Sequence, residues 1–292
     1  MKKVGIISSG DMGSAVGMRL NQSGVDVYTS DENRSSRTIK RAEQVGIKNA
    51  GSIKSLVSTS DILLSIVPPG FAFAVASRIL TFIGKSDTSP VFIECNAISP
   101  ATMRKISLLF AGHSNNVIDA GIIGGPPTSN TSPRFYCSGP SLDSLSVLSD
   151  SGLDIRILGP NIGDASAFKM LYAASTKGTT ALWSQLMIAA KILDLEVPLL
   201  EEFQQNRSEI SNKLLNEIPR MPRRSARWIS EMEEIANTFK ELGMTPKMME
   251  GAAEIFELVS ETKLSNQTSD EADPTLEFTM GILAEHVKKK SD

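Results

Sequence analysis

The sequence predicts an α/β protein with two parts: a doubly wound parallel sheet over residues 1–160, followed by an all-α domain over residues 161–292. Up to about residue 160, short apolar runs alternate with helical patterns, whereas almost every later segment is helical. The run from 163 to 193 has many alanines, no proline and a single internal glycine, Gly178. It predicts one long helix that joins the two domains and on which the second is built.

The composition is that of an ordinary globular protein, with 292 residues of which 41% are hydrophobic. A formal net charge of -3 gives no general attraction to nucleic acid or to anionic membranes. No apolar run approaches the roughly 20 residues that a membrane-spanning helix needs. Only two histidines and two cysteines occur, without metal-ligand spacing. We therefore expect a cytoplasmic protein without a metal site and with a small-molecule substrate.

The turn between the first strand and the first helix indicates a dinucleotide site. An apolar run at 3–7 is followed by SSGDMG at 8–13 and then by a helical pattern. Gly10 and Gly13 allow the backbone to approach a ligand closely, and the N–H groups at the helix start can hold a pyrophosphate. Ser8 stands where the usual GxGxxG pattern has its first glycine, and glycines also mark ordinary turns. We expect a Rossmann domain that binds its cofactor through Ser9, Gly10, Asp11 and Met12.

The end of the second strand, predicted over 25–30, should lie beside the adenosine ribose. Asp31 would favour NAD, because a carboxylate can bind the ribose hydroxyls. Arg34, Ser35 and Arg37 favour NADP, because guanidinium and hydroxyl groups hold a 2′-phosphate through charge-assisted hydrogen bonds. We expect NADP, with NAD as the less favoured cofactor. In the alternative interpretation Ser35 only caps the next helix, and the arginines lie exposed.

Later strand ends supply further candidates. The strand predicted over 62–67 ends at Val67, Pro68 and Pro69, where cofactors commonly lie in such sheets. Asn96 follows a strand at 92–95 and, unlike the neighbouring capping residues, has no structural explanation, so we expect it to contact cofactor or substrate. A strand at 117–120 leads into the glycine–proline loop GIIGGPP. Two more strands, at about 135–138 and 155–158, complete the predicted sheet.

Four stretches, in order, resemble the signatures of the β-hydroxyacid dehydrogenase superfamily, which includes hydroxyisobutyrate dehydrogenase, phosphogluconate dehydrogenase and the imine reductases. These are SSGDMG at 8–13, NRS at 33–35, ECNAISP at 94–100 and DAGIIGG at 119–125. The resemblance spans nearly the whole chain. It implies that Asn33 joins Arg34 and Ser35 in NADP binding, that the substrate loop contains Ile123, Gly124 and Gly125, that Lys169 is the catalytic lysine, and that the protein is a homodimer.

The C-terminal part resembles a less characterised branch with a distinctive C-terminal domain. RWISEMEEI at 227–235 carries this resemblance, and in that branch a second lysine, here Lys177, is also followed by glycine. Other positions depart from the better-known hydroxy acid enzymes: Asn96 and Ala97 replace a serine and a threonine, Ile123 replaces a serine, and Ala173 replaces an asparagine. The cofactor half of the pattern is largely kept, and the substrate half is changed.

Lys169 is the residue expected to carry the chemistry. Hydride transfer at a hydroxyl carbon requires a group that removes the hydroxyl proton or returns it, and a lysine with a lowered pKa can do so. On a continuous α-helix Thr176 lies about 20° from Lys169 and Tyr172 about 60°, whereas Lys177 is about 80° away. We expect Asn96 to orient the substrate. The further residues expected around the substrate are Ile123, Gly124, Gly125, Tyr172, Ala173, Lys177, Trp228 and Glu231.

Structural explanations compete for several of these residues. Lys177 could pair with an acid such as Asp164 or Glu196, and Trp228 could lie in the core. Arg227 and Glu231, spaced i and i+4, could pair on a helix surface. The four arginines at 220–227 could face an anionic substrate or form a solvated loop.

Three functions remain open. The leading one is an NADP-dependent oxidoreductase that acts on a small, anionic β-hydroxy acid or the corresponding carbonyl, with Lys169 as general acid/base. The second is a reductase of C=N bonds, which the loss of the serine and of the asparagine at Ala173 favours. The third is a non-catalytic NADPH-binding sensor, which would tolerate replacement of Lys169.

Overall fold

The structure is a computed structural model that describes residues 2–83, 89–112, 117–128, 131–268 and 271–291. Its contacts divide the chain into two compact units, Met1–Met170 and Leu171–Asp292. The division therefore falls inside a helix and later than the boundary expected after residue 160. The first unit is an α/β sandwich and the second is helical, which confirms the predicted fold class.

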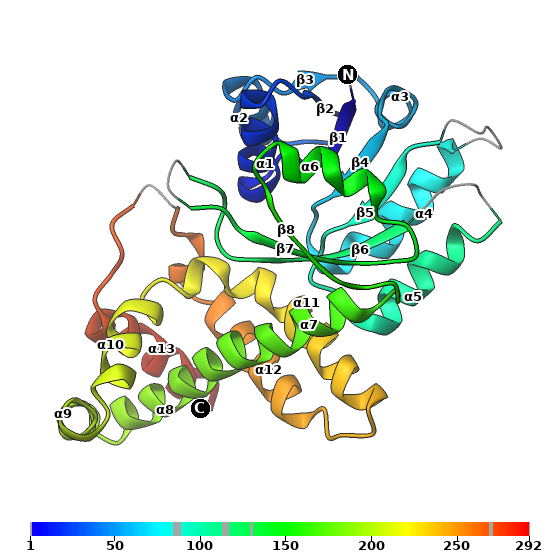
Figure 1. Ribbon diagram of the computed structural model, residues 1–292. Coiled ribbons are helices and arrows are strands. Elements are labelled where there is room, and N and C mark those ends of the chain that lie inside the picture. The colour runs from blue at the N-terminus through cyan, green and yellow to red at the C-terminus, as the bar shows by residue number, and fades with distance from the viewer. Residues whose placement is uncertain (1, 84–88, 113–116, 129–130, 269–270, 292) are drawn as a thin grey trace. The chain divides into compact units, whose positions relative to one another are not determined.

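An eight-stranded sheet organises the first unit, in the order β3-β2-β1-β4-β5-β6-β7-β8 (Figure 1). The strands are β1 (Lys3–Ile7), β2 (Asp26–Thr29), β3 (Lys48–Asn49), β4 (Ile62–Ser65), β5 (Val91–Glu94), β6 (Val117–Ile123), β7 (Arg134–Ser138) and β8 (Asp154–Gly159). The strand order reverses between β1 and β4, and ligands bind at this switch point in doubly wound sheets. The sequence pattern misses β3, because its two polar residues form no apolar run.

The sheet is not parallel throughout, so the prediction is wrong at one point. Strands β1 to β6 pair parallel, but β6 and β7 pair antiparallel, from Asp119 opposite Ser138 to Ile123 opposite Arg134. A parallel connection needs a crossover of a dozen or more residues. Here ten residues, 124–133, connect the two strands, and the chain turns back directly. Residues 121–123, expected in a loop, therefore belong to β6.

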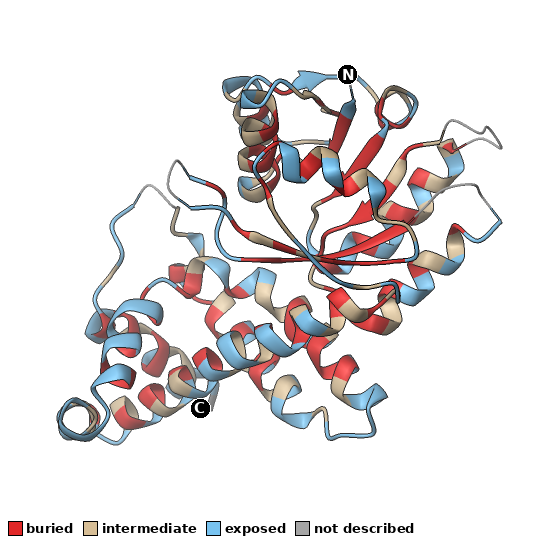
Figure 2. Cartoon of the chain, viewed as in Figure 1, coloured by how far each residue is buried: buried red, intermediate tan, exposed pale blue. Residues whose placement is uncertain are grey.

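Helices cover both faces of this sheet (Figure 1). On one face pack α1 (Asp11–Gln22), α2 (Ser36–Gln44) and α6 (Ser146–Asp150); on the other pack α3 (Ile53–Thr59), α4 (Ala72–Phe82) and α5 (Pro100–Leu109). Because successive side chains of a strand point to opposite faces, β1 sends Val4 and Ile6 into the first core and Ile7 into the second. Figure 2 shows the central strands buried and the outer sides of these helices exposed.

The predicted long helix is interrupted. It consists of α7 (Asp164–Ala173), a π-helical segment over Ala174–Gly178 and α8 (Thr179–Ile192). Hydrogen bonds in a π turn reach one residue further than in an α-helix, so the residues beyond it are set back by about one position around the helix axis. The angles predicted for Thr176 and Lys177 assume a continuous α-helix, and both residues lie instead within the π-helical segment.

The second unit contains only helices among its described residues. Beyond α8 come α9 (Glu196–Asn206), α10 (Ser208–Glu217), α11 (Pro222–Glu241), α12 (Lys247–Ser260), the short η4 (Lys263–Asn266) and α13 (Leu276–Ser291). Helix α11 packs along α12, and α8 contacts both α12 and α13. Within the described ranges, none of the helices combines the length and the apolar character that crossing a membrane requires.

Two acidic side chains are buried side by side in the sheet. Glu94 on β5 pairs in register with Asp119 on β6, and each residue is 1% exposed. Burial raises the pKa of Glu94 to about 8, against the opposing effect of hydrogen bonds from the Asn96 N–H and from the side chains of Ser65 and Asn96. Its Oε2 atom is buried and accepts no hydrogen bond among the described residues. At neutral pH Glu94 is therefore mainly protonated.

Glu94 makes the stability of the fold depend on pH. The folded state keeps a proton up to about pH 8 that the unfolded chain releases near the ordinary pKa of 4.5. Stability should therefore fall as pH rises from about 4.5 to 8, by up to roughly 5 kcal/mol from this group. Urea unfolding of wild type and Glu94→Gln across this range measures the effect, because the neutral variant should lack this loss. Glu43→Gln, at an exposed acid, should follow wild type; parallel profiles for wild type and Glu94→Gln would contradict the assignment.

Candidate active site

The turn between β1 and α1 has the shape of an anion cradle. A Cβ on Gly13 would lie 2.3 Å from the carbonyl oxygen of Ser8, so only glycine lets the helix approach the strand this closely. A Cβ on Gly10 would meet nothing within 4 Å, which leaves open space before the helix. The first intrahelical bond runs from Ser14 N–H to Gly10 C=O, at 2.9 Å. The preceding N–H groups at the N-terminus of α1 can therefore bind a phosphate.

Ser8 departs from the usual glycine at a position where the backbone favours glycine. Its φ is +80°, in the left-handed region that most L-residues avoid. The turn thus keeps the conformation of the glycine pattern although it lacks the first glycine.

The side chains of the predicted cofactor turn have partners within the protein. Ser9 donates to the Thr29 hydroxyl at 3.0 Å in the buried contact between β1 and β2. Asp11 pairs with Arg41 at 2.7 Å, and Met12 packs against the core. In this turn, therefore, the backbone rather than the side chains is available to a cofactor.

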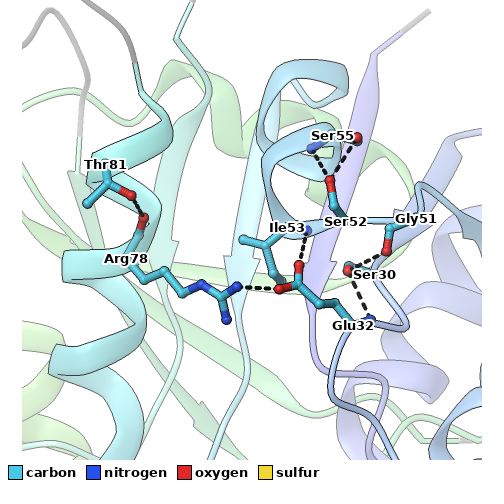
Figure 3. A network of polar contacts seen from close by, with 8 residues as sticks. All are labelled: Ser30, Glu32, Gly51, Ser52, Ile53, Ser55, Arg78 and Thr81. Carbon is cyan, nitrogen blue, oxygen red and sulfur yellow. Dashed lines mark hydrogen bonds and ion pairs between the residues drawn. The ribbon is translucent and has the colours of Figure 1, made fainter.

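A polar network holds the acidic residues that follow β2 (Figure 3). Glu32 accepts a hydrogen bond from the Ile53 N–H at 2.9 Å and forms an ion pair with Arg78. Ser30 accepts from the Glu32 N–H at 3.2 Å. Asp31, whose side chain is not drawn there, accepts from Asn49 Nδ2 at 2.5 Å. Both carboxylates that could bind ribose hydroxyls are thus occupied by the protein.

Arg34 is the cation best placed for an anion at this end of the site. Asn33 has a φ of +59°, and the Arg34 N–H donates to the Asp31 carbonyl at 3.0 Å, so the chain turns tightly before α2. The Nε atom of Arg34 is buried and has no hydrogen-bond partner among the described residues. Burial and the charge of Arg78 lower the pKa of Arg34. Its guanidinium is therefore partly buried beside both Arg78 and Glu32, and among the described residues its Nε is an unused donor.

The two other candidates of this segment differ from Arg34. Ser35 is the N-cap of α2 and accepts from the Thr38 N–H at 3.3 Å, as the structural interpretation predicts. Arg37 is exposed on the first turn of α2.

Asn96 connects two strand ends at the switch-point side of the sheet. Its Oδ1 accepts from the Val67 N–H at 2.6 Å, and its Nδ2 donates to Ser65 Oγ at 3.1 Å. The residue is 4% exposed. Its amide therefore holds the segment that contains Val67 and Pro68 in place. Pro68 is exposed, whereas Pro69 is buried at the start of a short 3-10 helix (Pro69–Phe71).

Asp119 anchors the helix that carries Lys169. Its carboxylate accepts hydrogen bonds from the N–H groups of Gly163 and Ser166, at 2.9 and 3.0 Å, and from Ser166 Oγ at 2.7 Å. Ser138 adds a fourth donor at 3.3 Å. Burial raises the pKa of Asp119, and these donors oppose the shift. Sequence reasoning did not assign this role to Asp119, although an acid within an apolar strand was the available signal.

Lys169 lies against the end of β6. Its Nζ donates to the Ile122 carbonyl at 2.5 Å, and the residue is partly buried. A Cβ on Gly121 would lie 2.8 Å from Lys169 Cβ, so glycine is needed where helix and strand meet. The structure thus brings together Lys169 and the predicted substrate loop. In that loop Ile123 is buried, and Gly124, with a φ of +117°, and Gly125 are exposed.

A second group of predicted residues meets in the helical unit. Lys177 pairs with Glu231 at 2.5 Å, and its Nζ lies 5.7 Å from the centroid of the Trp228 ring. The expected alternatives for Lys177, Asp164 and Glu196, are therefore wrong as its partners, because Glu231 on α11 takes that place. Arg227 lies 3.6 Å from Glu231, so the predicted i, i+4 pair forms, but Glu231 is buried and not on the helix surface.

The remaining candidates of this unit differ in exposure or have other ion-pair partners. Tyr172 is 44% exposed, whereas Ala173 is buried. Arg220 and Arg223 both pair with Asp273, at 2.7 and 2.9 Å. Throughout the described ranges, no group of three His, Cys, Asp or Glu side chains is arranged to hold a metal ion.

Family models match two parts of the chain. Residues 3–147 match the NAD binding domain of 6-phosphogluconate dehydrogenase, and residues 190–259 match a domain of unknown function, DUF1932. An uncharacterized 28.5 kDa protein of Methanothermus fervidus is 29% identical over 203 residues, which are 70% of this chain and 76% of that protein. The two family models thus match the α/β unit and the helical unit, respectively.

Solved structures give the same comparison. A conserved protein of unknown function, described as similar to 3-hydroxyacid dehydrogenases, is 29% identical over 91% of this chain and 100% of its own, with a TM-score of 0.65. Mycobacterium tuberculosis 3-hydroxyisobutyrate dehydrogenase with L-serine is 18% identical. The match covers 97% of this chain and 99% of that chain, with a TM-score of 0.68. Aspergillus terreus reductive aminase with NADPH is 16% identical. The match covers 89% of this chain and 92% of that chain, with a TM-score of 0.54. The last two share the fold.

The two glycines of the turn should respond differently to alanine. Gly10→Ala fills open space, so the fold should tolerate it, but its methyl group should lower NADPH affinity at least tenfold by occupying the phosphate cradle. Gly13→Ala should destabilise the protein, by about 1–3 kcal/mol, because its methyl group meets backbone. Thermal unfolding and NADPH titration by fluorescence measure both effects. A Gly10→Ala protein that binds NADPH like wild type would contradict the cradle.

Proposed function

Because this chain is a β-hydroxyacid dehydrogenase-like, NAD(P)-dependent oxidoreductase with a distinctive C-terminal domain, we propose that it transfers hydride between NADP and a small β-hydroxy acid or the corresponding carbonyl compound. Lys169 is the general acid/base of this reaction. The contact of its ammonium group with the Ile122 carbonyl at the end of β6 is the observation that carries the proposal. Hydride transfer of this kind needs a proton donor close to the oxygen on the reacting carbon of the substrate. Strand β6 leads directly into the proposed substrate loop.

The bound nicotinamide supplies or accepts the hydride, and the residues of this chain do the rest. Gly10 and the N-terminus of α1 bind the pyrophosphate. Asn96 holds the Val67–Pro69 segment against the cofactor rather than contacting the substrate itself. Lys169 returns a proton to the substrate oxygen on reduction and removes it on oxidation. Ile123, Gly124, Gly125, Tyr172 and Ala173 are the proposed neighbours of the substrate.

NADP rather than NAD is the proposed cofactor. Asp31 and Glu32, the carboxylates that would select NAD, already bond to Asn49, Ile53 and Arg78. The buried Nε of Arg34 has no partner in the part of the chain that the structure describes, and a 2′-phosphate would supply its acceptor. Asn33, Ser35 and Arg37 complete the proposed phosphate site at the start of α2.

Reduction of a C=N bond is the second candidate. Two positions that carry hydrogen-bonding side chains in the better-known hydroxy acid enzymes are the buried, apolar Ile123 and Ala173 here. Such a site has fewer groups to bind a substrate hydroxyl. Turnover of cyclic imines with NADPH, combined with failure of every hydroxy acid and carbonyl acid, would select this candidate.

We further propose that the protein acts as a homodimer through its helical unit. An apolar groove of about 440 Å³ lies between α8 and α9 and is lined by Leu186, Leu193, Leu195 and Leu199, among others. Leu182 on α8 and Val197 on α9 are close in sequence to the residues that line this groove, and both are exposed. Surface of this kind is costly in water, and a second copy of the chain would cover it.

Replacing Lys169 tests the central assignment. Lys169→Ala should lower kcat by about 10²–10⁴-fold, the usual contribution of a general acid/base, while the Kd for NADPH stays within about twofold. Lys105→Ala, at an exposed lysine on α5, should leave both values unchanged. Steady-state rates with β-hydroxy acids, carbonyl acids and imines would be measured beside NADPH titrations. Undiminished turnover by Lys169→Ala would sink the assignment.

Cofactor preference depends on Arg34. Arg34→Gln should weaken NADPH binding by about 10–100-fold, because a charge-assisted hydrogen bond is worth about 1.5–3 kcal/mol. NADH binding should change little, since NADH lacks the 2′-phosphate. Lys40→Gln, on an exposed position of α2, provides the matched loss of charge. Equal losses for NADPH and NADH would show that Arg34 does not read the phosphate.

A further inference from the structure

The charged group around Lys177 is unusual for the interior of a helical unit. Lys177 and Glu231 form an ion pair at 2.5 Å, and their side chains are only 14% and 8% exposed. Arg227 lies 3.6 Å from the other carboxylate oxygen of Glu231 and is half-exposed. Desolvation of two charges offsets much of their attraction, and well-packed apolar residues often replace such pairs without loss. Stability alone therefore gives a weak account of this pair.

The backbone that carries Lys177 is also irregular. Lys177 is in the π-helical segment between α7 and α8. Single π turns within α-helices are rare, and they occur frequently at functional sites. The next residue, Gly178, has no side chain, and a Cβ there would lie 3.3 Å from Met249 Cε on α12. The helix thus gives up its regular hydrogen bonding where it presents this lysine to α11.

An unused donor lies in the same group. The Trp228 ring packs edge-on against Phe256, with centroids 5.1 Å apart, and faces the Lys177 ammonium. Its Nε1 atom is buried and has no hydrogen-bond partner among the described residues. Indole can only donate, and buried donors normally have an acceptor. The group therefore lacks an acceptor beside Trp228.

Charge identifies the missing acceptor. Lys177 and Arg227 carry two positive charges, and Glu231 carries one negative charge, so the group has an excess of one positive charge. Nearby Arg224 is also in a positive environment: burial lowers its pKa most, and the charges of Arg223 and Arg227 lower it further. A carboxylate would both accept from the indole and balance the excess. A neutral amide or alcohol would do only the first.

We propose that Trp228, Lys177 and Arg227 form a binding site for a small carboxylate, in which the Trp228 N–H donates to a carboxylate oxygen and the two cations balance its charge against Glu231. The site deepens the proposed function, on which it rests, by naming a carboxylate as the group that the substrate carries. Glu231 keeps the two cations in place when no ligand is bound.

Matched acids and amides test this site. The probes are 3-hydroxypropanoate, 3-hydroxybutanoate and 3-hydroxy-2-methylpropanoate, each beside its primary amide. Calorimetric titration uses the full-length protein saturated with NADPH, with which these alcohols cannot react. At least one acid should bind ten or more times more tightly than its amide. If no acid binds more tightly than its amide, the proposal is overturned.

Two variants separate the charge from the hydrogen bond. Arg227→Gln, at a half-exposed position, should weaken the acid about tenfold and leave the amide unchanged. Trp228→Phe keeps a ring but removes the N–H, and it should also weaken the acid about tenfold. Trp183→Phe is the control, because that indole packs against Phe203 elsewhere in the unit. Acid affinities within twofold of wild type in both variants would overturn the proposal.

The cofactor provides an independent readout of folding and of the proposed function. Both variants should bind NADPH like wild type, and Trp228→Phe should unfold at a temperature close to that of Trp183→Phe. If the wild-type protein binds NADPH but turns over no hydroxy acid, carbonyl compound or imine, the proposed function fails. If turnover depends on Lys169 but acids and amides serve equally well, only the carboxylate site fails.

Discussion

The hydrogen bonding of the buried Asp119 carboxylate is the interaction on which the proposed site depends. The carboxylate lies within the sheet, and it accepts hydrogen bonds from Gly163 and Ser166 at the start of α7. A helix start leaves backbone N–H groups without intrahelical partners, so a carboxylate there both satisfies them and favours the helix dipole. Five residues after Asp164, Lys169 reaches back to the same strand at Ile122. Strand β6 thus fixes both the direction of the helix and the place of its lysine.

Polar side chains also bond within the protein at the strand ends proposed to meet the cofactor. Side chains that an analysis of types alone would give to a ligand, such as Ser9, Asp31 and Asn96, bond instead to neighbouring strands and loops. These bonds hold the backbone in place, and this end of the sheet then offers the N–H groups of the β1–α1 turn and the Nε of Arg34, which has no partner among the described residues. Rigid placement of this kind reduces the entropy lost when a ligand binds. In the proposed function, polar residues at these strand ends serve the cofactor mainly by holding the backbone that meets it.

The sequence predicts the fold of the first unit well because its signals are local. Apolar runs mark β1, β4 and β5 within a residue or two, and the SSGDMG turn marks the start of α1. The antiparallel β7 could not be predicted in the same way, since pairing direction depends on the connection and not on the strand itself. The catalytic role of Lys169 comes from a resemblance and stays a prediction. Asp119, Glu94 and the pair of Lys177 with Glu231 depend on contacts between residues 25 to 54 positions apart, which no local pattern reports.

The π turn changes how this helix can be compared with others. In an uninterrupted α-helix the seventh residue after a given one returns to nearly the same side. One additional residue within the turn moves that place to the eighth, and the eighth residue after Lys169 is Lys177. An alignment without gaps to a protein whose helix has no π turn would therefore pair the residues beyond this segment with the wrong positions. The single extra residue works as an insertion that lengthens no loop, and it turns the positions of α8 by about one residue relative to an uninterrupted helix.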